Sequence, residues 1–389
     1  MKTRVIIKEH KEYILDEIVF SIREFFNEFD LFDKLKDKKL ILLKPNLLGA
    51  HHPDKAVTTH PVVLEALIMI LKDMEKEIIV GDSPGGTAKA SVVWKTTGIQ
   101  EICERHNVRL IDFGKEGIIN IQTNLTKFFF DKYIIECDAI INLAKMKTHS
   151  LMLYTGAVKN LYGAIPGLYK SELHKQFPSP KEFSSVLSAI YGLLKPSLAL
   201  NIIDGIIGME GDGPSAGKPY PFGVLIASEI ASATDFVASG LMGFDVDNIV
   251  YLKQSLQDDE VKYLENDIDI LCREKKLNLQ EIKEILNYKK INIKSVIFSN
   301  NLLDKLPKFI KNIFKALLDY YPDFNKECQM CLVCAQSCPV QALDSKGNEL
   351  ILNKKKCIKC LCCHEMCQYN AIFLKKRFLA KIIYRNIDS

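Results

Sequence analysis

The sequence lacks the features that would place the protein in a membrane, outside the cell or on nucleic acid. No apolar run reaches the roughly 18 residues from which a membrane-spanning helix is expected. The first residues interleave charges with apolar side chains, where an export signal needs an unbroken apolar core. The net charge is only +4, and the basic runs carry no interleaved stacking aromatics. We therefore expect a cytoplasmic protein with no transmembrane segment and no nucleic-acid partner.

Two further absences narrow the chemistry. No G-x-G-x-x-G follows a predicted strand, so the usual dinucleotide-binding turn is not supported. The cysteines are not spread evenly as in a secreted disulfide scaffold, because nine of the twelve lie between Cys328 and Cys367. Dense cysteines in a protein without an export signal indicate metal binding.

The 389 residues, 48% of them hydrophobic, suffice for two or three globular domains. Up to about residue 250, strand-like apolar runs alternate with amphipathic helical segments. This alternation predicts an α/β domain with a mostly parallel sheet. The predicted strands are 39–44, 77–81, 108–113, 139–143 and 198–203, and the predicted helices are 17–29, 92–105 and one that begins at Pro61.

Polar motifs follow four of these strands. They are Lys44-Pro45-Asn46, the glycine-rich turn 81–86, the segment 145–149, and Asp204. Because the carboxyl ends of parallel strands line the ligand crevice of such sheets, we expect these motifs to meet in one cleft.

The chain beyond residue 250 has a different character. Residues 251–325 are rich in Lys, Leu and Ile, which predicts a helical extension or connector with a basic amphipathic helix at Leu306–Tyr321. We therefore divide the chain into an α/β domain (1–250), the connector (251–325), a small cysteine-rich α+β domain (326–373) and a basic tail (374–389).

The cysteine-rich domain repeats one spacing, C-x2-C-x2-C-x3-C. Pro339 follows the first run, and Gln368 stands at the matching place after the second. The two runs are Cys328, Cys331, Cys334 and Cys338, then Cys357, Cys360, Cys363 and Cys367. This pattern resembles the bacterial two-cluster ferredoxins, which carry two 4Fe–4S clusters. The alternative is a pair of zinc sites, but these usually combine two C-x2-C knuckles.

The ferredoxin resemblance implies that the runs exchange their fourth ligands. One cluster takes Cys328, Cys331, Cys334 and Cys367, and the other takes Cys357, Cys360, Cys363 and Cys338. Such a pair implies a relay of low-potential electrons, supplied by a redox partner protein of ferredoxin or flavodoxin type or by a reductase. Cys362 lies outside the spacing, so we expect a packed thiol there. The insert 340–356 predicts a β-hairpin that turns near Gly347.

A second set of motifs covers residues 40–240. In chain order they are Lys44–Asn46, Gly81–Gly86, Asn142–His149, Gly156–Gly167, Asp204-Gly205 and Glu210–Gly213. Together they resemble the domain-of-unknown-function 362 family, which often carries a C-terminal two-cluster ferredoxin module. The segment with His149, Lys159 and His174 also resembles the nickel-pincer lactate racemases. In those enzymes the lysine holds the cofactor and the histidines ligate metal or move the substrate proton. That likeness implies, as an alternative, a further metal in the N-terminal domain.

The residue types in the expected cleft suit a small anionic substrate. Lys145, Lys147, Lys159 and His149 form a cationic, hydrogen-bonding cluster. Crowded cations lower one another's pKa, which favours a neutral lysine as base or nucleophile, and Asp82 supplies an acid. Lys159, His149, Lys147 and Asp82 are therefore the candidate catalytic residues.

The leading hypothesis is an iron–sulfur oxidoreductase in which the ferredoxin module passes electrons to a substrate in the α/β cleft. Two alternatives stand beside it. One is a non-catalytic carrier or docking protein, in which the large domain only binds a partner. The other is a metal-dependent isomerase that resembles the racemases.

Overall fold

A computed structural model describes residues 2–85, 88–261, 267–288, 291 and 320–376. Most of the predicted helix at 306–321 and most of the basic tail lie outside the described residues. None of the helices in these ranges is long and apolar enough to cross a membrane.

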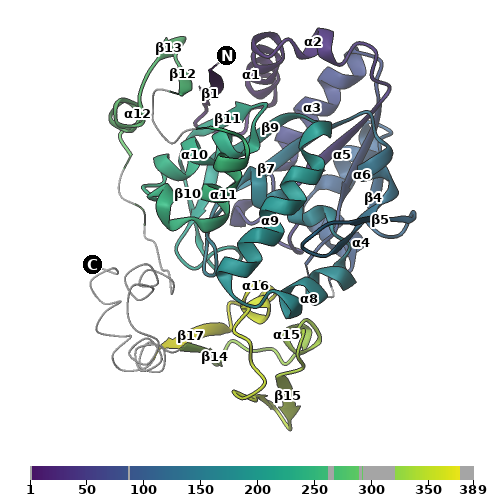
Figure 1. Ribbon diagram of the computed structural model, residues 1–389, viewed down its shortest axis with the longest axis vertical. Helices are drawn as coiled ribbons and strands as arrows, with labels where there is room; N and C mark the ends of the chain where they lie inside the picture. The colour runs from purple at the N-terminus through teal and green to yellow at the C-terminus, as the bar shows by residue number, and fades with distance from the viewer. Residues whose placement is uncertain (1, 86–87, 262–266, 289–290, 292–319, 377–389) are drawn as a thin grey trace.

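A large mixed sheet forms the centre of the described chain (Figure 1). From β9 through β7, β2 and β3 to β4 the neighbouring strands are parallel, whereas β11 runs antiparallel to both β9 and β1. The strands in spatial order are β13 (Lys275–Lys276), β12 (Ile268–Cys272), β1 (Thr3–Glu9), β11 (Val224–Ser228), β9 (Leu198–Glu210), β7 (Ala139–His149), β2 (Leu40–Pro45), β3 (Glu77–Asp82) and β4 (Arg109–Asp112), with β10 (Lys218–Tyr220) beside β9 and β8 (Leu153–Thr155) beside β7. The predicted α/β class with a mostly parallel sheet is confirmed.

Helices cover both faces of this sheet, because alternate side chains of each strand point to opposite sides. In β2, Ile41 and Leu43 pack with the first five helices, whereas Leu42 packs into a core that the later helices share. The first group is α1 (Leu15–Glu28), α2 (Leu31–Lys34), α3 (Pro61–Asp73), α4 (Ala90–Thr96) and α5 (Ile99–Arg105). The second group is α6 (Lys132–Glu136), α7 (Ala157–Asn160), α8 (Gly167–Gln176), α9 (Pro180–Leu194), α10 (Ala231–Leu241), α11 (Val250–Asp258) and α12 (Leu279–Ile285). The hairpin β5 (Ile118–Gln122) and β6 (Lys127–Asp131) stands beside this second group.

Two central strands are longer than the sequence predicts. The segment 145–149 belongs to β7 and Asp204 belongs to β9, so these polar residues lie within strands rather than in the loops after them. The reason is that β7 and β9 are neighbours, and Lys145 lies directly opposite Asp204. Polar side chains that pair across two strands do not end them.

The predicted helix 92–105 is also corrected. It is two helices, α4 and α5, which are separated at Gly98. Gly98 has φ 75°, a left-handed conformation that glycine adopts readily and that interrupts a right-handed helix.

The chain after residue 250 contributes strands as well as helices. The helices α11 and α12 agree with the expected helical character, but β12 pairs in parallel with β1 and extends the large sheet. Alternate residues of β12 are buried, as in a strand that packs one face on a core.

The cysteine-rich segment folds as a small α+β unit below the end of α8 and α9 (Figure 1). Strands β14 (Tyr320–Phe324) and β17 (Ile372–Lys376) pair antiparallel and bring its two ends together. The predicted hairpin is confirmed as β15 (Leu343–Lys346) and β16 (Glu349–Leu352), which turn at Gly347. Two short helices, α15 (Val333–Gln336) and α16 (Cys362–Glu365), follow the C-x2-C turns.

Candidate functional site

A chain of asparagine side chains ties the strand ends to α7. Asn46 donates to Asn160 at 2.9 Å, Asn160 donates to Asn142 at 2.8 Å, and Asn142 donates to Asn201 at 2.9 Å. Asn142 and Asn201 lie on β7 and β9, and Asn46 follows β2 directly. Buried amides that satisfy one another fix the orientation of each. The network therefore sets the position of the helix that carries Lys159.

The start of α7 is fixed by a buried carboxylate. Asp235 of α10 accepts hydrogen bonds from the backbone N–H groups of Ala157 (2.5 Å) and Val158 (3.0 Å). Burial raises the pKa of Asp235 to about 7, although these two N–H groups oppose the rise. A Cβ at Gly156 would lie 2.1 Å from the Asp235 carboxylate, so only glycine fits there.

Asp82, at the end of β3, forms a buried ion pair with Lys44 of β2. The Lys44 ammonium donates to one carboxylate oxygen at 2.8 Å, and the backbone N–H of Leu47 donates to the other at 2.7 Å. Burial lowers the pKa of Lys44, and the adjacent carboxylate opposes this. Gly163 packs against the pair, since a Cβ there would lie 2.2 Å from the carboxylate.

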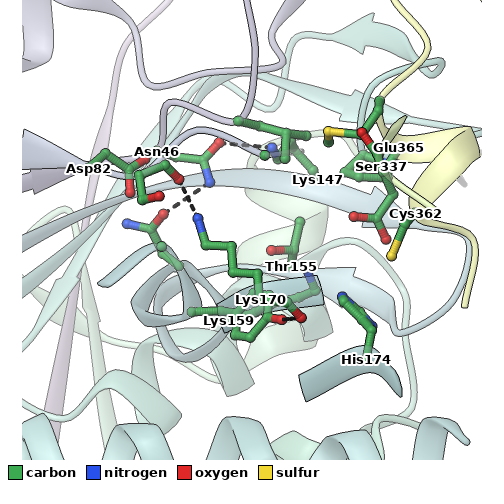
Figure 2. Close-up of a pocket in the computed structure, with 18 of the residues that line it drawn as sticks. Asn46, Asp82, Lys147, Thr155, Lys159, Lys170, His174, Ser337, Cys362 and Glu365 are labelled. Atoms are coloured by element: carbon green, nitrogen blue, oxygen red, sulfur yellow. Dashed lines mark hydrogen bonds between the residues drawn. The ribbon is translucent and has the colours of Figure 1, made fainter. Parts of the chain in front are cut away.

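A cavity of about 90 Å³ lies between this polar end of the sheet and the cysteine-rich segment. Figure 2 shows Asp82 and Asn46 on one side of it and Cys362 and Glu365 of α16 on the other. Of the four predicted catalytic residues, three line the cavity: Asp82, Lys147 and Lys159.

The two predicted lysines differ in their partners. Lys147 is buried, and its ammonium donates to the side-chain oxygen of Asn46 (2.9 Å) and to the carbonyl of Val57 (2.6 Å). Burial and the neighbouring Lys159 hold its pKa well below the usual range. Burial also lowers the pKa of Lys159. Within the described ranges, no acceptor forms a hydrogen bond with the Lys159 ammonium.

His149 lies behind the cavity wall. Its Nδ1 accepts from the backbone N–H groups of Leu151 (3.1 Å) and Met152 (3.2 Å), which assigns the proton of the neutral ring to Nε2. Nε2 lies 3.2 Å from an oxygen of Glu365 but is not aligned for a hydrogen bond. Burial lowers the pKa of His149 to about 4, so the ring is neutral near pH 7.

Helix α8 brings a lysine and a histidine to the same cavity. Lys170 is buried and donates to the carbonyl of Ser83, and burial lowers its pKa to about 7. His174 stacks on Phe183 with ring centroids 4.2 Å apart, and burial lowers its pKa to about 4. Lys170 was not among the predicted site residues, although its spacing of four residues from His174 places both on one face of a helix.

Ser337, Cys362 and Glu365 also line the cavity, and all three come from the cysteine-rich segment. Ser337 and Glu365 were not among the predicted site residues, because no local sequence pattern indicates that one domain packs into the cleft of another. Cys362 was expected to be a packed thiol, and the structure places it in the cavity wall. Two opposing effects act on the pKa of Glu365: burial raises it, whereas His149 and Lys159 lower it. The net result is a pKa below the usual range.

The pair Lys145–Asp204 lies apart from this cavity. The Lys145 ammonium donates to Asp204 at 2.8 Å, and Tyr13 donates to the other oxygen of the same carboxylate at 2.8 Å. These groups satisfy one another and join the N-terminal segment to the sheet.

The two cysteine runs have matching backbones. Residues with positive φ occur at corresponding places, 29 positions apart, in both runs: Met330 and Lys359, Leu332 and Leu361, and Gln341 and Asn370. Each left-handed residue reverses the chain direction locally, which lets cysteines two residues apart face the same point. The two runs therefore have the same local fold.

The fourth cysteine of each run receives a backbone hydrogen bond. The N–H of Ala342 donates to the sulfur of Cys338 at 3.2 Å, and the N–H of Ala371 donates to the sulfur of Cys367 at 3.3 Å. Such bonds favour a sulfur that carries negative charge.

The cysteines gather in two groups. Burial, with a contribution from the nearby Cys331, Cys367 and Cys328, raises the pKa of Cys334 to about 11. Burial also raises the pKa of Cys357, and Cys360 and Cys338 act in the same direction. The fourth cysteine of each run thus lies with the first three of the other run.

No three His, Cys, Asp or Glu side chains in the described ranges converge on a point suited to one metal ion. The four thiolates of a 4Fe–4S cube bind four different irons and stand further apart than the ligands of one ion. The grouping of the cysteines is compatible with a metal cluster. The further metal expected from the racemase resemblance has no such ligand set in the described N-terminal domain.

The architecture is an α/β domain whose cationic cleft is closed by a cysteine-rich segment. The sequence model of the family described as domain of unknown function (DUF362) matches residues 41–240, about half of the chain. The chain therefore belongs to this family.

One curated relative is a thylakoid-associated protein of Synechocystis sp., which is 30% identical over 207 residues. The match covers 53% of this chain and 63% of the relative, so it spans less than two thirds of that protein.

Two solved structures are distantly similar. One is the lactate racemase apoprotein of Thermoanaerobacterium thermosaccharolyticum, with a TM-score of 0.39 and 15% identity over 61% of this chain and 57% of that one. The other is a structural-genomics target from Thermotoga maritima, with a TM-score of 0.36 and 13% identity over 65% of this chain and 60% of that one.

Proposed function

We propose that the protein is an iron–sulfur oxidoreductase. Its cysteine-rich segment holds two 4Fe–4S clusters and delivers low-potential electrons to a small substrate in the cleft of the α/β domain. The observation that carries this proposal is the double role of α16. The helix contains Cys363, a proposed cluster ligand, and it also contributes Cys362 and Glu365 to the wall of the cavity.

The ligand sets are those of the ferredoxin resemblance: Cys328, Cys331, Cys334 and Cys367 for the first cluster, and Cys357, Cys360, Cys363 and Cys338 for the second. The repeated backbone of the two runs, the N–H bonds to their fourth sulfurs and the exchange of fourth cysteines between groups support this assignment. When bound, such clusters supply one-electron transfer at potentials that span roughly −700 to +450 mV.

The difference in burial between the two cysteine sets favours electron transfer from the first cluster to the second. Cys331 of the first set is exposed, whereas Cys360 and Cys363 of the second set are buried. A redox partner of ferredoxin, flavodoxin or reductase type would therefore dock near Cys331, and the second set would serve the cavity. A cytoplasmic location fits such a partner, and fractionation of cells between membrane and soluble protein tests it.

Anaerobic purification, metal and sulfide analysis, and a redox titration followed by EPR test the proposal. We expect about eight irons per chain and two 4Fe–4S signals at low potential. In the variant Cys360→Ser, the signal of one cluster should be lost or altered while the other remains. Zinc in place of iron would refute the central claim.

The carrier hypothesis makes a different prediction for the cleft. If the α/β domain only docks a partner, Lys159→Met leaves electron flow through the clusters to any acceptor unchanged. If the cleft is the site of reduction, this variant keeps both EPR signals but loses turnover of the substrate. The racemase-like alternative requires nickel, or an adduct mass on Lys159, in the purified protein.

A further inference from the structure

The cavity wall contains more lysines than carboxylates that could pair with them. Asp82 is already paired with Lys44. Lys147 and Lys170 are held only by neutral oxygen atoms, and Lys159 has no hydrogen-bond partner within the described ranges. Glu365 is the remaining acid of the cavity wall. Three cavity lysines thus share one carboxylate that has no cationic hydrogen-bond partner among the described residues, and burial lowers the pKa of each lysine. Buried charges are ordinarily paired, and a bound anion would favour the charged form of these lysines.

Hydrogen-bond donors without partners point to the same place. The Ser337 hydroxyl is buried, with 4% of the residue exposed, and none of the described residues forms a hydrogen bond with it. The imidazole of His174 and the ammonium of Lys159 line the same cavity from α8 and α7. Buried polar groups are almost always satisfied, and oxygen atoms of a ligand would satisfy all three.

The size of the cavity limits what it can hold. About 90 Å³ is room for several water molecules or for an anion of a few heavy atoms.

We propose that the cleft binds a small dianion, such as a short dicarboxylate or a phosphate, through Lys159, His174 and Ser337. Lys147 and Lys170 line the same cavity, where a dianion would favour their charged forms, and Glu365 opposes a ligand of higher negative charge. This inference rests on the proposed function for the identity of the site as the substrate cleft, and it names the class of substrate. Because Ser337 and Glu365 come from the cysteine-rich segment, the complete site exists only when that segment is seated on the α/β domain.

Calorimetric titration of the anaerobic full-length holoprotein with oxalate, inorganic phosphate and acetate tests the proposal. At pH 7.5 we expect saturable binding of at least one dianion, at least tenfold tighter than that of acetate. Binding of oxalate alone identifies a dicarboxylate site, and binding of phosphate alone identifies a phosphate site. Equal affinity for acetate and the dianions, or no saturable binding of either dianion, would overturn the proposal.

Variants separate charge from hydrogen bonding. Lys159→Met should weaken dianion binding at least tenfold, and Ser337→Ala should weaken it a few-fold without a change of charge. Glu365→Gln should tighten it about tenfold, because it removes the competing carboxylate. Lys175→Met is the matched control, since Lys175 is exposed on α8 beside Glu172 and should have no effect. Unchanged binding in either Lys159→Met or Glu365→Gln would refute the assignment, so the test holds even if one of the two variants proves unstable.

A negative result in the binding experiment can be distinguished from a negative result in the test of the proposed function. Dianion binding by a protein that contains zinc would leave the binding site standing and remove the electron relay. Two 4Fe–4S signals in a protein that binds no dianion would retain the relay and refute the substrate class.

Discussion

The α/β domain and the cysteine-rich segment are stabilised by different means. The α/β domain buries apolar side chains on both faces of its sheet, in two large cores. The core of the cysteine-rich segment is a small cluster of Cys334, Leu343, Cys363 and Ile372, in which two of the four side chains are proposed cluster ligands. A small domain that buries little apolar surface generally needs a metal or disulfides to fold. The comparison indicates that the first region folds by itself and that the second depends on what its cysteines bind.

Removal of the metal should give the largest effect and should be confined to one region. After anaerobic chelation of iron, we expect residues 320–376 to lose protection from amide hydrogen exchange, because their core loses the group that joins its cysteines. Protection of β2, β7 and β9 should persist, since these strands lie in the centre of the large sheet. Mass spectrometry of the exchanged peptides measures both. If the segment stays protected without metal, the inference that its fold depends on what its cysteines bind is wrong.

The α/β domain has its own weakness, which is the charge buried in its cleft. Burial lowers the pKa of Lys170 from 10.5 to about 7 in the folded protein. Asp82 and Asp112 oppose this shift, whereas Lys44 and Lys159 add to it. The unfolded chain keeps the proton up to about pH 10.5, so between pH 7 and 10.5 it binds more protons than the folded protein. Stability must therefore rise with pH across that window.

The variant Lys170→Met lacks this dependence. Between pH 7 and 9, the free energy of unfolding of the wild type should rise relative to that of the variant by about 2 kcal/mol, at roughly 1.4 kcal/mol per pH unit as an upper limit. Urea denaturation followed by the fluorescence of Trp94 measures it, because the single tryptophan lies in α4 of the α/β domain. Lys175→Met, on the exposed side of the same helix, serves as the control. A constant difference between wild type and Lys170→Met would show that Lys170 keeps its proton in the folded protein.

The same contrast explains how far the sequence predicts the structure. The alternation of strands and helices and the rule that ligands bind at the carboxyl ends of parallel strands were enough to bring Asp82 and Lys147 together, and the likeness of its segment to the racemases added Lys159. The length of the insert between the two cysteine runs likewise predicted the hairpin at Gly347. These features depend on local pattern and on connections between neighbouring elements.

What the sequence did not predict depends on contacts between distant segments. Polar residues such as Lys145 and Asp204 normally mark a strand end, and only their mutual pairing across β7 and β9 lets both strands continue. Glu365 lies between cysteines in the sequence, and only the packing of the cysteine-rich segment on the α/β domain brings it to His149. No periodicity encodes that packing, since it results from the complementary shape and charge of two surfaces.

The smallest expected effects come from replacing one glycine by alanine in each region, which should change the stability of the two regions in opposite directions. Gly192 is an exposed residue within α9, and a Cβ there meets no atom within 4 Å. Gly192→Ala should stabilise the α/β domain by about 0.5–1 kcal/mol, because alanine loses less backbone entropy in a helix. Gly347 turns the hairpin with φ 60°, and although its Cβ position is also open, Gly347→Ala should destabilise the hairpin by about 1 kcal/mol through the cost of the left-handed conformation. Trp94 fluorescence measures the first change, and hydrogen exchange of β15 and β16 measures the second. Neither added Cβ meets a neighbouring atom, so the sign of each change in the free energy of unfolding depends on the backbone conformation alone. Changes of the same sign would contradict the helical conformation of Gly192 or the left-handed conformation of Gly347.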